Sequence, residues 1–278
     1  MKKFKIGVQL YSVRDDMEKD MRGTLEKIKE MGYDYVEFAG YFGKTAEEVR
    51  AMLDEIGLEA VSVHQGYNLF LEEGQAAVDY LKTLGVKYCA VPWMDVSQHK
   101  GTDAFDKTVE DFKTVSKMLD DGGIQLLYHN HDFEFNKFED KFLLDWLYET
   151  LDEDTLKTEI DTCWVRYAGY DPCEYIVKYT GRSPIVHLKD FTANNIGSGE
   201  AVYALIDDSG NEQDKPSKEE NQFKFRAIGD GVQDVKAIIE AAEKAGAEYL
   251  IVEQDQSDDM PALESVKRSR EYLKSLGQ

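Results

Sequence analysis

The side chains best suited to chemistry lie in one short stretch, residues 124–135, which reads IQLLYHNHDFEF. An apolar run of strand length ends there in a cluster of polar groups, namely His129, Asn130, His131, Asp132 and Glu134. Imidazole and carboxylate groups bind divalent metals and transfer protons. The stretch therefore predicts a site for a polar ligand at the end of a strand.

The end of a short apolar run is also the position of most histidines in the chain, which are His64, His129, His131 and His187. A single histidine in such a place is commonly a hydrogen-bonded packing residue. Four of them, together with Asp161 in EIDT and Glu253 in YLIVEQD, indicate that several strand ends converge on one site.

The composition is that of a globular protein of ordinary size. Of the 278 residues, 42% are hydrophobic and 12% aromatic, and the apolar runs are too short to span a membrane. The start, MKKFKIGVQLYS, passes directly into a strand without the apolar segment of a signal peptide, so we expect a cytoplasmic protein. Three scattered cysteines without a CxxC pair argue against a disulfide framework or a zinc knuckle.

The formal net charge of -22 limits the partners. Nucleic acid phosphates and anionic lipid head groups would be repelled by such a protein. We therefore expect a small-molecule substrate, and neither a nucleic acid nor a membrane as partner.

One pattern repeats along the chain: an amphipathic helix, a turn containing glycine, and a short apolar strand. Glycine ends helices because it adopts the left-handed conformation without steric cost, and six glycines fit that position: Gly32, Gly57, Gly85, Gly123, Gly181 and Gly246. With the opening FKIGVQL and the KTEID segment, the pattern predicts eight strands.

Strands joined by helical crossovers are parallel, so we predict a single-domain (β/α)8 TIM barrel over residues 1–278. A doubly wound open sheet is the alternative. The barrel is favoured because no glycine-rich phosphate motif follows the first strand and because polar residues end nearly every strand.

The carboxyl ends of the strands of a barrel form one rim, where active sites lie. The residues expected to bind substrate on this rim are Gln9, Tyr11, Glu37, His64, Trp93, Trp164, Lys189 and Arg226. The two tryptophans would form apolar walls, and the lysine and arginine are the basic residues placed near the rim. Further candidates without an assigned role are Glu159, Asp190 and Asp255.

Residues 192–226 interrupt the repeat after the seventh strand. The segment contains DDSGNEQDKPSKEENQ, so we expect an irregular polar loop that acts as a mobile lid, an oligomer contact or a disordered insertion. Beyond it, the turn at residues 229–231 is interpreted as the N-terminal cap of the next helix.

Three successive strands end in Asp161, His187 and Glu253, and the fifth strand would supply a fourth metal ligand. Two carboxylates and one imidazole favour one divalent ion, Mn, Mg, Co or Zn. Such an ion would polarise a sugar carbonyl while a carboxylate or imidazole moves the proton on the neighbouring carbon. The predicted reaction is isomerisation or epimerisation of a ketose or a related sugar.

Six motifs in order, KIGVQLYS, GYDYVEFAG, YHNHDFEF, EIDTCW, HLKD and IVEQD, resemble the xylose isomerase-like TIM-barrel superfamily. This group includes sugar phosphate isomerases and epimerases, ketose 3-epimerases, inosose dehydratases and endonuclease IV enzymes. In the ketose epimerases the resemblance implies one metal held by a glutamate, an aspartate, a histidine and a glutamate from strands 5 to 8. The last three positions match Asp161, His187 and Glu253.

The first of these four positions falls on His129 instead of a glutamate. Either His129 is itself the ligand, or Glu134 reaches back from the loop, which is the preferred arrangement. The groups expected to carry acid and base roles are His129, His131, Glu134 and Glu253. A histidine in place of the family's glutamate base would favour dehydration or elimination over epimerisation.

Two other functions stay open, an inosose dehydratase or lyase acting on keto sugars and a noncatalytic sugar-binding barrel. Endonuclease IV activity is disfavoured because the chain has too few histidines for that zinc site and an acidic surface. With few basic residues near the rim, the expected substrate is an unphosphorylated sugar or cyclitol. Barrels of this type often pair through helix faces, so a homo-oligomer is compatible with the sequence.

Overall fold

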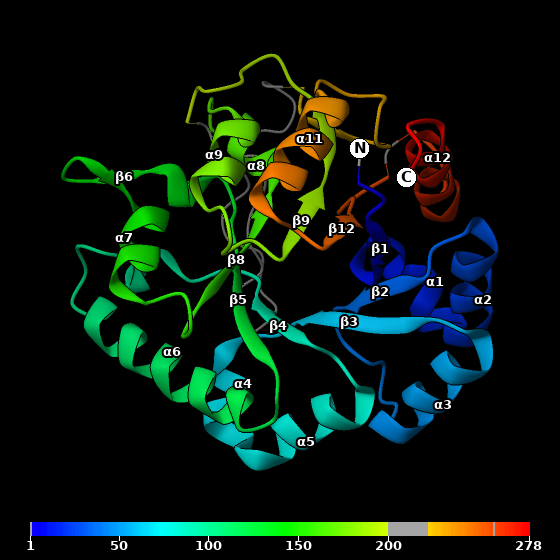
Figure 1. Ribbon diagram of the computed structural model, residues 1–278, viewed down its shortest axis with the longest axis horizontal. Helices are drawn as coiled ribbons and strands as arrows, with labels where there is room; N and C mark the ends of the chain where they lie inside the picture. The colour runs from blue at the N-terminus through cyan, green and yellow to red at the C-terminus, as the bar shows by residue number, and fades with distance from the viewer. Residues whose placement is uncertain (1, 200–221, 258) are drawn as a thin grey trace.

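Eight parallel strands form a closed barrel in the computed structural model, which describes residues 2–199, 222–257 and 259–278 (Figure 1). Around the barrel the strands follow the order β1 (Lys5–Gln9), β12 (Tyr249–Val252), β9 (Ile185–Leu188), β8 (Lys157–Asp161), β5 (Gln125–His129), β4 (Tyr88–Val91), β3 (Glu59–His64) and β2 (Tyr35–Phe38). The predicted (β/α)8 barrel is thus confirmed, and the open sheet is excluded.

Helices surround the barrel on its outside (Figure 1). The longer ones are α2 (Met21–Met31), α3 (Ala46–Ile56), α5 (Gln75–Leu84), α6 (Phe105–Asp120), α7 (Leu143–Thr150), α11 (Val235–Ala245) and α12 (Ala262–Ser275). The shorter ones are α1 (Arg14–Lys19), α4 (Tyr67–Glu73), α8 (Thr162–Tyr167) and α9 (Pro172–Lys178), with single 3-10 turns at Leu10–Val13, Val96–Gln98 and Phe133–Phe135. None of the helices in the described ranges is long and apolar enough to cross a membrane.

Local sequence explains where several helices begin and end. The α3 helix starts at a capping box, in which the Thr45 hydroxyl accepts from the Glu48 backbone and the Glu48 carboxylate accepts from the Thr45 backbone. Left-handed C-terminal caps are confirmed at Gly32, Gly57, Gly85 and Gly246. The other two glycines predicted as caps, Gly123 and Gly181, also have positive φ but lie beyond the cap residues Asp121 and Tyr179.

Side chains that face the barrel interior are two residues apart along a strand. Leu127, Ile185 and Ile251 belong to one buried apolar cluster in the lower part of the barrel. Two residues further along the same strands lie His129, His187 and Glu253, at the carboxyl end. The alternation of strand residues therefore places an apolar base beneath a polar site.

The prediction of an irregular loop over residues 192–226 is wrong at both ends of this segment. Strand β10 (Asp190–Thr192) pairs antiparallel with β11 (Lys224–Arg226), and their phenylalanines join an apolar cluster with Trp164 and Tyr167. Residues 200–221 lie outside the described residues, and with them most of the proposed lid or oligomer contact. A second short antiparallel pair, β6 (Lys137–Phe138) and β7 (Lys141–Phe142), follows the 3-10 turn after β5.

The two chain ends meet on the outside of the barrel, between β1 and α12 (Figure 1). The backbone N–H of Phe4 donates to Oε1 of Gln278 at 2.9 Å, and the Gln278 side-chain amide donates to the Lys2 carbonyl at 3.1 Å. The last residues thereby fasten the first strand of the barrel.

Candidate metal centre

Four potential metal ligands converge at the carboxyl end of the barrel. Ligand atoms of His129, Asp161, His187 and Glu253 all lie within 4.8 Å of one another, and all four side chains are buried. They come from the last residues of β5 and β8, from β9 and from the residue after β12. We call this set the rim group. The structure thus brings together the three residues expected from successive strands.

The donors of the rim group fit a divalent cation. Asp161 is oriented by its own helix, because its Oδ1 accepts from the backbone N–H of Cys163 at 2.7 Å and of Trp164 at 3.2 Å. Its Oδ2 is buried without a hydrogen-bond partner in the described chain and lies 3.6 Å from Nε2 of His129. Two carboxylates and two imidazoles suit Zn, Mn or Co.

Burial and charge set the ionisation of the group. Burial raises the pKa of Asp161 to about 7, against the opposing effect of the Lys189 ammonium. Burial would also raise the pKa of Glu253, but Lys189 and His187 hold it well below its usual value. Burial lowers the pKa of His129 to about 3, so this imidazole is neutral and able to ligate.

Lys189 lies inside the same group, only 2% exposed. Its Nζ is 2.6 Å from Oδ1 of Asp255, 3.1 Å from Oε2 of Glu253 and 3.5 Å from Oδ2 of Asp161. The lysine predicted to bind substrate therefore lies among the potential metal ligands, and its role stays a prediction.

A second polar layer lies directly beneath the rim group. Oε1 of Glu159 is 2.6 Å from Nε2 of His64, and Oε2 of Glu37 is 2.7 Å from Nε2 of His187. Gln9 donates to Oε2 of Glu37 at 3.0 Å. We call Gln9, Glu37, His64 and Glu159 the lower layer. Three of them were predicted to bind substrate, and here their contacts are with protein groups.

Glu134 is not part of the rim group, and this corrects the preferred fourth ligand. Its Oε1 accepts from the Tyr128 hydroxyl at 2.5 Å and its Oε2 from the backbone N–H of His131 at 2.8 Å. With both oxygens held in this way, Glu134 fastens the turn after β5 instead of reaching the metal position. His129 takes the fourth place.

Aromatic rings border the rim group on one side. His131 stacks on Trp164 with ring centroids 5.3 Å apart, and Lys189 Nζ lies 5.0 Å above the same indole. Nδ1 of His131 is buried without a hydrogen-bond partner among residues 2–199, 222–257 and 259–278. Burial lowers the pKa of His131 well below its usual value, so the ring is neutral.

The remaining predicted substrate contacts lie further out. Tyr11 and Trp93 are half-buried beyond β1 and β4, and the Arg14 guanidinium lies 4.1 Å above the Tyr11 ring. Their roles stay predictions.

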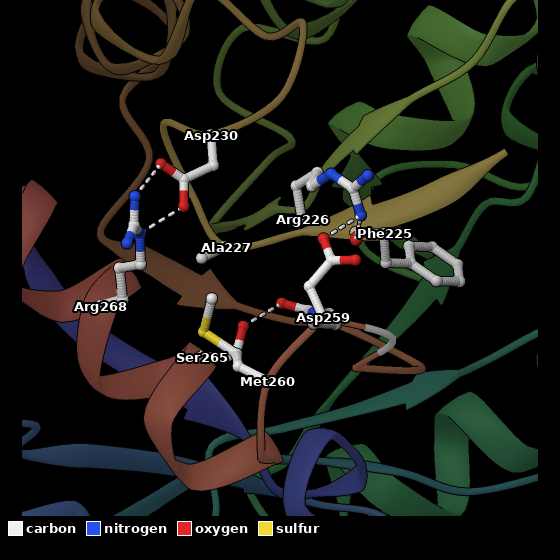
Figure 2. A pocket seen from close by; sticks show the side chains of 9 residues that line it. Phe225, Arg226, Ala227, Asp230, Asp259, Met260, Ser265 and Arg268 are labelled. Carbon is white, nitrogen blue, oxygen red and sulfur yellow. Dashed lines mark hydrogen bonds and ion pairs between the residues drawn. The ribbon is translucent and has the colours of Figure 1, made fainter.

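Arg226 lines a separate cavity of about 340 Å³ beside β11 and the start of α12 (Figure 2). Its guanidinium is 2.6 Å from Oδ2 of Asp259, and across the cavity Arg268 pairs with Asp230. The structure does not bring Arg226 into the rim group.

Sequence reasoning left Glu159 and Asp255 without roles, although a signal for them was present. Each lies two residues from a ligand candidate, Asp161 and Glu253, and so faces the same side of the strand or its extension. This spacing places a second polar group next to each predicted ligand.

Comparison with known proteins agrees with this architecture. An inosose dehydratase of Geobacillus kaustophilus is 28% identical over 190 residues, a match that spans 60% of this chain and 61% of the relative's length. Among solved structures, a sugar phosphate isomerase/epimerase from Parabacteroides distasonis superposes with a TM-score of 0.76 at 22% identity, covering 98% of each chain.

A second solved structure, the IOLI protein with a bound zinc atom, superposes with a TM-score of 0.71 at 16% identity and covers 98% of this chain and 97% of its own. At such identities the structural likeness concerns the fold. A family model, the xylose isomerase-like TIM barrel, matches residues 25–276. The chain therefore belongs to the xylose isomerase-like TIM barrel family.

Proposed function

We propose that this protein is a divalent-metal-dependent dehydratase that removes water from a keto sugar or keto cyclitol. The observation that carries the proposal is the buried Lys189 ammonium inside the rim group, 3.1 Å from Glu253 and 2.6 Å from Asp255. Its position beside potential metal ligands provides a proton donor where the substrate would bind. The resemblance to an inosose dehydratase supports the same reaction class.

The metal would be held by His129, Asp161, His187 and Glu253. When bound, such an ion polarises a carbonyl and so acidifies the neighbouring C–H bond. Because the rim group is buried, its charged groups would interact more strongly with the substrate than they would in water.

Two residues of this chain would move the protons. Nδ1 of His131 accepts the proton from the carbon next to the carbonyl, and the electron pair of that bond forms a carbon–carbon double bond. The C–O bond of the hydroxyl on the following carbon breaks, and Lys189 donates a proton so that the group leaves as water. Solvent then takes the proton from His131 and returns one to Lys189. General acids of this kind contribute about 10²- to 10⁴-fold to rate.

Isomerisation or epimerisation is the second candidate, because it begins with the same removal of a proton. The YHNHDFEF and HLKD motifs do not distinguish between these two reaction classes. The test incubates the metal-loaded protein in deuterated water with inososes, keto sugars and ketoses, with and without chelator. We expect chelator-sensitive formation of an unsaturated product. Deuterium uptake without loss of water would instead favour the isomerase, and neither event would favour a noncatalytic sugar-binding barrel.

A Lys189→Met variant sharpens this test. Water loss should fall by at least 100-fold, while deuterium exchange next to the carbonyl should persist because His131 is retained. Equal loss of both activities would show that Lys189 is not the proton donor to the leaving group.

A further inference from the structure

Two imidazoles belong to both polar layers of the barrel. His129 and His187 are in the rim group, and the same two residues also form a second potential metal-binding set with His64 and Glu159. Each ring therefore directs one nitrogen toward the rim group and the other toward the lower layer. The role of the lower layer therefore depends on which nitrogen of each shared imidazole carries the proton.

His129 shows the relation most clearly. Its Nδ1 lies 3.2 Å from Oε1 of Glu159 in hydrogen-bond geometry, and its Nε2 lies 3.6 Å from Oδ2 of Asp161. A carboxylate that accepts from one ring nitrogen places the proton there and leaves the lone pair on the other nitrogen for a metal. Glu159 would thus present Nε2 of His129 to the rim group.

Glu159 is itself firmly held. Its Oε1 is also 2.6 Å from Nε2 of His64 and 3.1 Å from Nε2 of His187. The carboxylate is fully buried on β8, two residues before Asp161. One oxygen therefore connects three imidazoles, and a shift of this carboxylate would alter the direction of His129.

A second metal in the lower set is chemically disfavoured when the rim group is filled. Both shared imidazoles would have to ligate through both nitrogens, and a neutral imidazole keeps a proton on one of them. Two metals would therefore require His129 and His187 to lose their remaining N–H protons and to bridge the two ions as imidazolates.

We propose that Glu159 is a positioning residue that fixes the tautomer and direction of His129 for metal binding in the rim group, and is not itself a ligand. The inference rests on the proposed metal centre. It deepens that proposal by assigning a role to a residue beneath the site. Outer partners of this kind contribute about 10- to 100-fold to metal affinity.

The test measures Zn affinity by competition with a chelating dye and the visible absorption spectrum of the Co-substituted protein. Glu159→Ala should weaken Zn binding about 10- to 100-fold and change the Co spectrum. Glu159→Gln should lose less, because its amide oxygen can still accept from Nδ1 of His129. Wild-type protein should bind one metal per chain.

Asp145→Asn is the matched control, because Asp145 on α7 is also a buried carboxylate, accepting from Tyr175, Tyr179 and Lys178. It should leave Zn affinity and the Co spectrum unchanged. Glu253→Gln tests the metal centre separately, since it removes a proposed ligand and should abolish tight binding. If Glu253→Gln binds as wild type, the proposed centre is wrong whatever Glu159 does.

Two results would overturn the positioning role itself. One is wild-type affinity and spectrum in both Glu159 variants while Glu253→Gln fails to bind. The other is two metals per wild-type chain with one lost from Glu159→Ala, which would make Glu159 a ligand.

Discussion

Asp161 and Asp190 are both buried aspartates that end or follow neighbouring barrel strands, yet their carboxylates serve different purposes. Oδ1 of Asp161 accepts from two backbone N–H groups, whereas its Oδ2 accepts no hydrogen bond from the described residues and lies within the rim group. Asp190 uses both oxygens for backbone groups, with Oδ1 accepting from Phe191 and Gln233 and Oδ2 from Gly229 and Gly231.

The difference separates a carboxylate that could bind a metal from one that holds a turn of the backbone. A carboxylate whose oxygens are both occupied by protein donors has little capacity left for a cation, and Glu134 belongs to the same class as Asp190. All three residues are buried, and each lies at or beyond the carboxyl end of a barrel strand. Among them, only Asp161 has an oxygen, Oδ2, that accepts no hydrogen bond from the described residues.

The strongest test of this comparison is Asp161→Asn. The amide keeps an oxygen for the Cys163 and Trp164 N–H groups but places no anionic donor in the rim group, so metal affinity should fall by more than the roughly 100-fold that an outer partner costs. The metal-free protein should unfold within about 1 kcal/mol of wild type. Isothermal titration and urea denaturation measure the two quantities. Retained metal affinity would remove Asp161 from the ligand set.

Glu134→Gln should change the pH dependence of stability. Burial raises the pKa of Glu134 from its usual 4.5 to about 8. The native state then keeps a proton that the unfolded chain releases, so the unfolding free energy is lost as pH rises from about 4.5 through 8. Relative to the glutamine variant, wild type should lose roughly 4 kcal/mol between pH 4 and 9. Urea denaturation across this range measures the difference. Parallel curves for the two proteins would mean that Glu134 is ionised in the native state.

Asp190→Asn should act on stability and spare the metal. Its amide nitrogen would face the N–H groups of Gly229 and Gly231, leaving two part-buried donors without their acceptor at a cost of roughly 1–3 kcal/mol. Thermal denaturation measures the loss, and Zn affinity should stay within about threefold of wild type. A large loss of affinity at unchanged stability would place Asp190 in the metal site and undo the comparison.

Much of the barrel could be predicted from sequence because its signals are local. Glycine caps such as Gly32 and Gly57 mark helix ends, and short apolar runs mark strands. The convergence of Asp161, His187 and Glu253 followed from barrel topology, which brings strand ends to one rim whatever the details of packing.

Side-chain partners were harder to predict because they depend on contacts between distant segments. Glu134 has the right residue type near the right strand, but the Tyr128 hydroxyl and a turn backbone occupy it. The β10 and β11 pairing joins residues separated by more than thirty positions, with a polar segment between them. The turn at residues 229–231 was wrongly interpreted as a helix cap, since Asp234 caps α11 and the turn binds Asp190.

Because Asp190 accepts hydrogen bonds from the turn at residues 229–231, the HLKD and GDG motifs depend on each other. A β-carbon at Gly231 would overlap the Asp190 carboxylate and lie 2.5 Å from the Phe191 carbonyl oxygen. Glycine is therefore required at position 231 by its neighbours in space and not by a left-handed backbone. During evolution the two positions should accordingly change together, with a side chain at 231 tolerated only after the aspartate has been replaced and the loop has moved away.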